Sequence, residues 1–298
     1  MSAKAGSLKT LLPRCAFPLA GETLVCAVSG GADSLALLAL AVEAGCEVTA
    51  VHVDHALRPA SGDEADVVAR AAARFGARFE ARRVCVEPGP NLEARARAAR
   101  YAVLPSDVAT GHTLDDQAET VLLNLLRGAG LDGLAGMART ATRGKDKRPQ
   151  RPLLKLRRTE THALCASLGL DPVHDPANDD PAYRRNRVRH ELMALLDDIA
   201  GRDLAPVLDR QAGLLADEAD LLDALAAEID ATDARVLAAA PVALARRAVR
   251  RLLADEHPPD AAAVERVLAV ARGDAVGCEV APGLRVRRSG GRLFVSPA

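Results

Sequence analysis

Strand-like and helix-like segments alternate regularly over the first 128 residues of the chain. The strand-like runs are short, and they lie at residues 23–28, 47–55, 77–86 and 107–112. A segment of helical length follows each run, and the last of these segments ends at Gly128. This alternation is typical of a doubly wound parallel sheet, so we predict an α/β fold for this part of the chain.

The pattern changes in the last third of the chain. Long helical stretches rich in Ala and Leu are followed by the run 283–295, in which Ser289-Gly290-Gly291 predicts a hairpin turn. At 298 residues the chain is long enough for two domains. We therefore predict a larger domain over residues 1–203 and a smaller, mainly helical domain with a terminal hairpin over residues 204–298.

The sharpest motif is Ser29-Gly30-Gly31-Ala32-Asp33-Ser34, which lies between the first predicted strand and its helix. Glycines allow a backbone to approach a ligand closely, and a helix N-terminus offers N–H groups that suit phosphate oxygens. Ser29 and Ser34 add hydroxyl donors, and Asp33 is placed to hold a Mg²⁺ ion that bridges phosphates. The motif predicts a phosphate-binding loop, and its alternative is a tight turn in which Ser and Asp cap the helix.

Two other nucleotide-binding signatures do not apply. The chain has no GxxxxGK[ST] sequence, which argues against a P-loop NTPase. A GxGxxG match at residues 128–133 follows a helix instead of a strand. We interpret it as a helix cap and loop, because a dinucleotide site needs the strand before it.

Two carboxylates stand close together after the fourth predicted strand. The segment 111–120 reads GHTLDDQAET, and a similar polar segment, HVDHALR at residues 52–58, ends the second strand. Doubly wound sheets bind ligands at this carboxyl edge. Asp116 and Glu119 are three residues apart at a helix start, so they share one face. Together they are suited to bind an ammonium ion or a metal, and one of them could accept the proton of the ammonium ion. The alternative is simple pairing with the helix dipole.

Arginines accompany these carboxylates in two places. Arg97 and Arg100 are also three residues apart on a predicted helix, and they suit a phosphate or a carboxylate. A second group occurs in RRNRVRH at residues 184–190, after the segment DPAN. The alternative for both groups is a solvated helix face.

Taken together, VSGGADS, HVDHALR, ARAARY, GHTLDDQAET and RNRVRH resemble the motifs of the tRNA(Ile)-lysidine synthase family, a branch of the PP-loop ATP pyrophosphatases. The resemblance covers residues 20–195 well and the last third more loosely. It implies a PP-loop catalytic domain, related to the adenine nucleotide α-hydrolases, and a tRNA-binding C-terminal domain. It also implies a ligase that adenylates the wobble cytidine O2 of a CAU-anticodon isoleucine tRNA. The ε-amine of free lysine then displaces AMP, and ATP and Mg²⁺ are required.

The same resemblance implies the residues of the site. The residues implied for catalysis are Asp33, Arg97, Asp116 and Glu119. Those implied for ATP binding are Ser29, Gly30, Gly31, Ala32, Asp33, Ser34 and Val53, with Asp33 also as the Mg²⁺ ligand. Those implied for binding lysine or tRNA are His55, Arg58, Arg100, His112, Asp115, Asp116, Glu119, Asn186, Arg187 and Arg189.

Local basic clusters are needed to bind tRNA, because the formal net charge is only −1. The aromatic fraction of 2% argues against an RNA module that stacks bases on aromatic rings. The candidate clusters lie at residues 139–158, 184–189, 246–251 and 285–292. No apolar run approaches the length of a membrane span, so we expect a cytoplasmic location and no membrane partner. A homodimer is compatible with the sequence.

Two alternatives to this function remain. One is another PP-loop tRNA-modifying or amide-forming ligase. The six cysteines include no CxxC pair that would favour a thiolase, and the length leaves no room for a glutaminase domain. The other is a non-catalytic nucleotide- or RNA-binding relative, which loss of Asp33 or of the carboxylates would favour. One departure from the family pattern is the short connection from Tyr101 to Val108, which predicts a truncated helix or an irregular turn.

Overall fold

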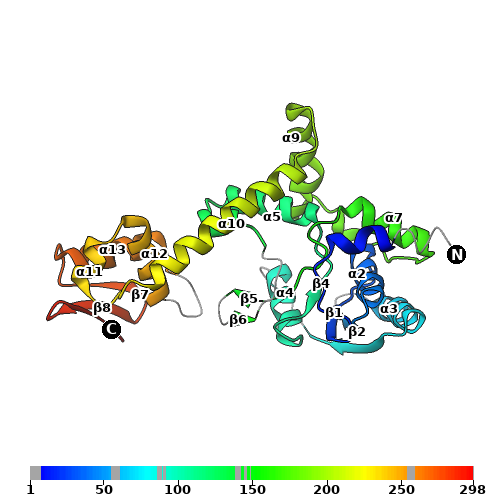
Figure 1. Cartoon of the computed structure of the whole chain (residues 1–298), viewed down its shortest axis with the longest axis horizontal. Helices are drawn as coiled ribbons and strands as arrows, with labels where there is room; N and C mark the ends of the chain where they lie inside the picture. The colour runs from blue at the N-terminus through cyan, green and yellow to red at the C-terminus, as the bar shows by residue number, and fades with distance from the viewer. Residues whose placement is uncertain are drawn as a thin grey trace. The chain divides into compact units, whose positions relative to one another are not determined.

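The chain forms two compact units, residues 1–213 and 214–298, in a computed structural model. The structure describes residues 8–54, 61–85, 89, 92–137, 142–143, 146–147, 149–253 and 259–297. The predicted domain boundary at residues 203/204 falls at the start of helix α10 (Ala205–Ala227), whereas the two units divide inside this helix, between Gly213 and Leu214. Each unit has its own hydrophobic core. Figure 1 labels helices and strands of both units.

The first unit contains the predicted parallel sheet. Its strand order is β3-β2-β1-β4, and each neighbouring pair is parallel. Strands β2 and β3 therefore follow one another on one side of β1, and β4 lies on the other side of β1. The point of reversal lies between β1 and β4, which is where doubly wound sheets bind ligands. The strands are β1 (Thr23–Ala27), β2 (Glu47–Asp54), β3 (Arg78–Arg83) and β4 (Ala109–Thr110).

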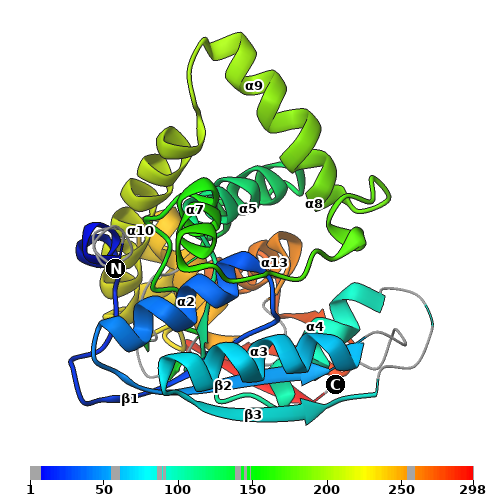
Figure 2. The ribbon, with the colours of Figure 1, turned by 90° about the vertical axis from the view of Figure 1, so that its right-hand side faces the viewer.

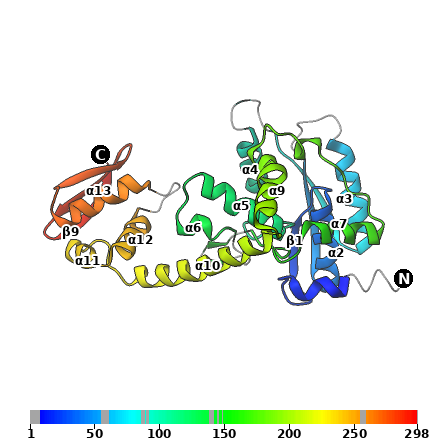
Figure 3. The same cartoon turned by 90° about the horizontal axis from the view of Figure 1, so that it is seen from above.

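Helices cover both faces of this sheet, as a doubly wound fold requires. Leu24 and Cys26 of β1 face the core that contains α2 and α3, whereas Val25 and Ala27 pack with Tyr101 at the end of α4. Figure 2 shows α2 and α3 lying over the strands. Helix α2 is buried almost all round, because α7 packs on it from the other side (Figure 3). The helices are α2 (Ala32–Glu43), α3 (Ser61–Phe75), α4 (Leu92–Ala102) and α7 (Arg158–Leu168).

The short connection before β4 is an irregular turn, as predicted. Helix α4 ends at Ala102, and single hydrogen bonds from Val103 to Arg100 and from Val108 to Pro105 close the turn. Strand β4 itself has only two residues, fewer than the predicted run 107–112. Gln150 pairs with the outer edge of β4, where it exchanges backbone hydrogen bonds with Val108 and Thr110.

Several shorter elements complete the first unit. The GxGxxG match begins with the predicted helix cap, because Gly128 has a φ of 74° just beyond α5. Its second half was predicted to be a loop and instead forms part of the short helix α6. A π-helical turn, η3, interrupts the long helical stretch near residue 190. The elements are η1 (Leu12–Arg14), α5 (Leu114–Leu126), α6 (Leu131–Leu134), β5 (Thr142–Arg143), β6 (Asp146–Lys147), η2 (Pro176–Asn178), α8 (Arg184–Arg187), η3 (Val188–Leu192) and α9 (Met193–Ala200).

The second unit packs helices against a small antiparallel sheet of order β7-β8-β9. The predicted hairpin is the β8–β9 pair, and its turn is Gly290-Gly291, whose φ values of 55° and 79° suit a type I′ turn. Strand β7 was not predicted. The elements are α11 (Ala234–Ala239), α12 (Val242–Leu252), α13 (Ala261–Arg272), β7 (Gly277–Ala281), β8 (Leu284–Ser289) and β9 (Arg292–Pro297).

All six cysteines are free thiols, and three of them are buried. Burial raises the pKa of both Cys15 and Cys165 to about 12, so neither is a ready thiolate. Within the described ranges, no helix is both long and apolar enough to cross a membrane.

Candidate functional site

The predicted phosphate-binding loop joins β1 to α2 at the point of reversal of the sheet. Gly30 has a φ of 88°, which only glycine adopts readily, and Gly31 caps α2 in an extended conformation. The Ser34 hydroxyl donates to the Gly31 carbonyl at 2.8 Å and accepts from the Ser29 N–H at 3.1 Å. The loop is therefore held by its own side chains, with the N-terminus of a well-buried helix behind it.

The end of β4 lies directly against this loop. A Cβ atom on Gly111 would stand 2.7 Å from the Asp33 carbonyl oxygen and 3.0 Å from the Ser34 nitrogen. Only glycine allows this approach without movement of the backbone. It brings the segment that carries Asp116 and Glu119 next to the phosphate loop.

Asp33 points from the first turn of α2 towards the first turn of α7. The Thr161 hydroxyl donates to Asp33 Oδ1, and Arg158 Nε lies 3.6 Å from Asp33 Oδ2. Burial raises the pKa of Asp33, while the Thr161 hydrogen bond and the Arg158 charge oppose the rise. A quarter of the Asp33 side chain remains exposed.

Asp116 and Glu119 lie on one face of α5, as their spacing predicts. Asp116 caps its own helix, since its Oδ2 accepts from the Thr113 backbone N–H at 2.9 Å and from the Thr113 hydroxyl at 3.0 Å. The Glu119 side chain is only 2% exposed. A buried carboxylate needs charged partners, because its desolvation is costly.

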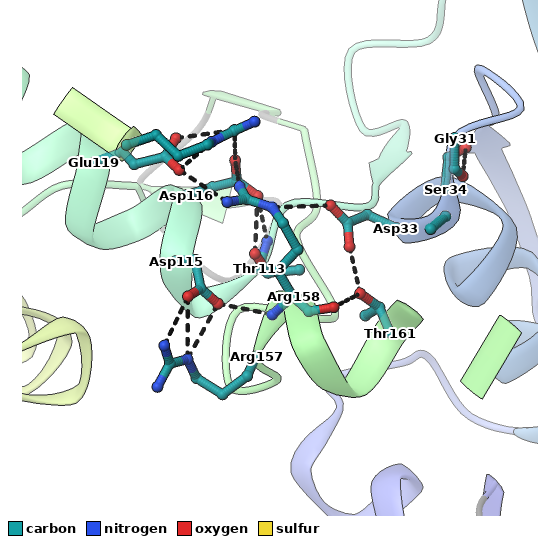
Figure 4. Close-up of polar contacts among 12 residues, drawn as sticks. Gly31, Asp33, Ser34, Thr113, Asp115, Asp116, Glu119, Arg157, Arg158 and Thr161 are labelled. Atoms are coloured by element: carbon teal, nitrogen blue, oxygen red, sulfur yellow. Dashed lines mark hydrogen bonds and ion pairs between the residues drawn. The ribbon is translucent and has the colours of Figure 1, made fainter. Parts of the chain in front are cut away.

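Those partners are three guanidinium groups, from Arg158, Arg185 and Arg189, which we call the arginine cluster. Arg158 donates to Asp116 Oδ1 at 2.8 Å and to Glu119 Oε1 at 3.0 Å. Arg185 donates to Glu119 Oε2 at 2.9 Å and to Asp116 Oδ1 at 3.0 Å. Arg189 donates to both Glu119 oxygens, at 2.7 and 3.2 Å. Figure 4 shows Arg158 between Asp33 and the carboxylates of α5.

The arginine cluster decides the charge of Asp116. Burial alone would raise the pKa of this carboxyl, but the charges of Arg158 and Arg185 and the Thr113 backbone hydrogen bond outweigh burial and hold its pKa well below the usual range. Asp116 therefore stays ionised at any physiological pH. The same carboxylates raise the pKa of Arg158 and of Arg185.

Asp115 has a different environment from its neighbour. It accepts from Arg157 Nη2 at 2.8 Å and from the Arg158 backbone N–H at 2.7 Å. These bonds fix the start of α7 against the start of α5. Asp115 thus fixes the position of the Arg158 backbone, from which the Arg158 side chain extends.

His112 and Asn186 are held by neighbouring groups. His112 Nδ1 lies 2.8 Å from the Thr110 hydroxyl, and burial lowers the pKa of the imidazole to about 4. The Asn186 amide donates to the Ala177 and Asp180 carbonyls at 2.8 Å, so it ties down the loop before α8.

The remaining predicted residues lie around this centre or outside the described part. Arg187 is exposed and pairs with Glu191 at 2.8 Å, away from the arginine cluster. Arg97 lies over the Tyr101 ring at 5.0 Å, and burial lowers the pKa of Arg100. Val53 is half-buried in β2. His55 and Arg58, which were predicted to bind substrate, lie outside the described residues.

Sequence reasoning missed three residues of this centre, Thr161, Arg158 and Arg185. Arg158 was assigned to a basic loop and Arg185 to a basic helix, each as a candidate tRNA contact. The structure instead surrounds both guanidinium groups with carboxylates. The available signal was the position of Arg158 just after three leucines, Leu153, Leu154 and Leu156, all of which are buried.

Several arginines of the second unit have partners inside that unit. Arg246 donates to Glu265 at 2.6 Å, Arg247 pairs with Asp223, Arg288 donates to the Ala271 carbonyl and Arg292 pairs with Asp230. Arg250, Arg251, Arg285 and Arg287 of the two predicted clusters are exposed, and so are the paired Arg246 and Arg292.

The parallel sheet, the loop after β1 and the adjoining carboxylates define a PP-loop ATP-binding protein. Residues 6–196 match the family described as PP-loop domain, and residues 233–294 match the TilS substrate binding domain. The U34-tRNA thiolase NcsA from Methanococcus maripaludis has a similar fold, with a TM-score of 0.55 and 19% identity over 72% of this chain and 79% of that chain.

Two curated relatives are much more similar in sequence. The tRNA(Ile)-lysidine synthase of Nocardia farcinica is 44% identical over 93% of this chain and 92% of its own length. That of Thermobifida fusca is 40% identical over 85% of this chain and 83% of its own length. The chain therefore belongs to the tRNA(Ile)-lysidine synthase family, which confirms the resemblance seen in its motifs and implies that it uses ATP.

Proposed function

We propose that this chain ligates free L-lysine to the wobble cytidine of a CAU-anticodon isoleucine tRNA. In the first step the cytidine O2 attacks the α-phosphate of ATP, and pyrophosphate leaves. In the second step the lysine ε-amine attacks C2 of the base, the ammonium loses its proton, and AMP leaves with the former O2. The domain of residues 1–203 carries the chemistry in this proposal, and residues 204–298 help to bind the tRNA.

The observation that carries the proposal is the link through Arg158. Its guanidinium group contacts Asp33 of the phosphate loop and the carboxylates of Asp116 and Glu119. A nucleotide on the loop and an ammonium ion at these carboxylates would thus lie in one connected centre. A ligase that joins an activated base to an amine needs both substrates in this proximity.

The loop suits the triphosphate of ATP. The loop ends at the first turn of α2, where the helix N-terminus offers backbone N–H groups and the helix dipole favours negative charge. Asp33 fits Mg²⁺, since it is a partly exposed carboxylate beside the proposed phosphate site, and Mg²⁺ prefers one or two carboxylates together with phosphates. When bound, the ion would neutralise charge on the leaving pyrophosphate.

Asp116 and Glu119 suit the lysine ε-ammonium. Asp116 stays ionised because of the arginines around it, so it attracts the ammonium but is a weak proton acceptor. This favours a binding role for Asp116 over the alternative role of general base. Asp115, in turn, positions Arg157 and the start of α7.

The tRNA needs contacts from beyond this centre. In this proposal Arg97, Arg100 and His112 contact the anticodon base, which has to enter at the carboxyl edge of the sheet, where His112 follows β4. Arg250, Arg251, Arg285 and Arg287 are exposed and suit phosphates of the tRNA body. His55, Arg58, Asn186, Arg187 and Arg189 stay predictions as substrate-binding residues.

The test uses purified protein with ATP, Mg²⁺, radiolabelled lysine and one of two tRNAs. We expect lysine to enter the CAU-anticodon isoleucine tRNA and not the initiator methionine tRNA, which shares the anticodon. One AMP should be released for each lysine, and Asp33→Ala should abolish both products. If AMP is formed without lysine transfer, the ATP chemistry stands and the lysine assignment is wrong.

A further inference from the structure

The carboxylates proposed to bind lysine already have all their acceptor positions filled. A carboxylate offers about four lone-pair positions. Asp116 Oδ2 accepts two hydrogen bonds from Thr113, and its Oδ1 accepts one each from Arg158 and Arg185. Glu119 Oε1 accepts from Arg158 and Arg189, and its Oε2 from Arg185 and Arg189.

The charges in this centre are balanced as well. The three guanidinium groups of the arginine cluster face the three carboxylates of Asp33, Asp116 and Glu119. An added lysine ammonium would bring a fourth positive charge into a largely buried, neutral group. It would also bring three N–H donors that find no open acceptor on either carboxylate. Lysine therefore needs one guanidinium group to withdraw.

Arg158 is the guanidinium group placed to withdraw. It is the member of the arginine cluster that also contacts Asp33, through Nε at 3.6 Å. Arg185 and Arg189 approach the carboxylates from α8 and η3, and their contacts are with Asp116 and Glu119. Phosphate oxygens bound beside Asp33 would offer Arg158 a new partner, and arginine pairs strongly with phosphate.

We propose that Arg158 is a positioning residue that makes lysine binding depend on bound ATP. Without nucleotide, Arg158 occupies acceptor positions on Asp116 and Glu119. With nucleotide, it moves its hydrogen bonds to the phosphates and leaves one position on each carboxylate for the ammonium. This inference rests on the proposed function, because it takes the same two carboxylates as the lysine site.

The test measures lysine binding to the whole chain by equilibrium dialysis, with and without Mg²⁺ and α,β-methylene-ATP. This analogue resists cleavage between the α- and β-phosphates, so binding is separated from catalysis. We expect lysine affinity to rise about tenfold with the analogue, within the usual range of coupling between two sites. By thermodynamic reciprocity, lysine must raise the affinity for the analogue by the same factor.

The Arg158→Gln variant tests whether the Arg158 side chain causes the coupling between analogue binding and lysine binding. We expect it to bind lysine more tightly than the wild type in the absence of nucleotide, and to lose most of the tenfold gain. The matched control is Arg14→Gln, which removes an arginine that pairs with Glu160 at 2.9 Å on the same first turn of α7. The control should keep the wild-type coupling.

The outcomes separate this inference from the function on which it rests. If wild-type lysine affinity is the same with and without the analogue, the inference is wrong and the lysine site stands. The inference is also wrong if Arg158→Gln keeps the full coupling. The circular dichroism spectrum of the variant shows whether it folds. If it does not fold, the inference is tested on the wild type alone, by lysine affinity with and without the analogue and by analogue affinity with and without lysine. Absence of lysine binding in every arm would overturn the lysine assignment together with the inference.

Discussion

Gly111 at the end of β4 lies against the backbone of Asp33, so closely that a Cβ atom there would stand 2.7 Å from the Asp33 carbonyl oxygen. This contact joins the two halves of the site, and neither residue reveals it through its place in the sequence. The phosphate loop thus depends on a glycine 78 positions away along the chain, as the difference between 111 and 33 gives.

We expect Gly111→Ala to displace the phosphate loop. The added methyl group meets backbone atoms of Asp33 and Ser34, which cannot yield without moving the start of α2. ATP-dependent AMP formation should fall at least about tenfold, with a loss of roughly 1–3 kcal/mol in the free energy of unfolding. Gly130→Ala is the control, since a Cβ at Gly130 meets nothing within 4 Å. Equal activity of the two variants would contradict the close approach.

Glu119→Gln should destabilise the first unit strongly. The substitution removes the buried charge that faces Arg158, Arg185 and Arg189, and leaves one of their three positive charges uncompensated. We expect a loss of about 3 kcal/mol or more in the free energy of unfolding, measured by urea titration. Glu191→Gln removes the exposed partner of Arg187 and should not move the urea midpoint. A stable Glu119→Gln protein would show that the ion pairs contribute little.

His112 should make stability depend on pH. Burial lowers the pKa of its imidazole from 6.5 to about 4, so between these values the unfolded chain binds a proton that the folded chain does not. The contribution is fully present above pH 6.5 and is lost as the pH falls towards 4, at up to about 1.4 kcal/mol per pH unit. Urea unfolding of His112→Gln should show a flatter profile in this window than the wild type. An equal slope in the two proteins would contradict the effect of burial on the His112 imidazole.

The parallel sheet, the glycine-rich turn between β1 and α2 and the shared helix face of Asp116 and Glu119 were all predictable from the sequence. Each depends on local patterns, namely strand and helix periodicity, a glycine-rich turn and a three-residue spacing. The roles of Arg158 and Thr161 were not predictable in this way. Their partners are more than 35 residues away along the chain. The packing of α7 against α2 brings Thr161 to Asp33, and the bonds of Asp115 to the start of α7 bring Arg158 to Glu119. The sequence does not show which carboxylates pair with a given arginine. The basic clusters were therefore predicted to contact tRNA.

Thr161→Val should weaken the use of Mg²⁺. Thr161 is fully buried, and its hydroxyl donates to Asp33 Oδ1, so its loss leaves the Asp33 carboxylate less well oriented. A hydrogen bond to a charged group contributes about 1.5–3 kcal/mol, which corresponds to a tenfold or greater loss of kcat/KM for ATP. The Mg²⁺ concentration for half-maximal activity should rise in Thr161→Val. Thr161→Ser keeps the hydroxyl and should stay near the wild type, and an equal defect in both would point to packing instead of the hydrogen bond.

The most direct test of the central claim is the mass of the wobble nucleoside. The CAU-anticodon isoleucine tRNA is incubated with the protein, ATP, Mg²⁺ and lysine, and is then digested to nucleosides for mass spectrometry. The account predicts that the wobble cytidine gains one lysine and loses one water, because its O2 leaves with AMP. An unmodified cytidine, recovered although AMP has been released, would contradict the claim that the phosphate loop and the carboxylates of Asp116 and Glu119 form one lysine-ligating site.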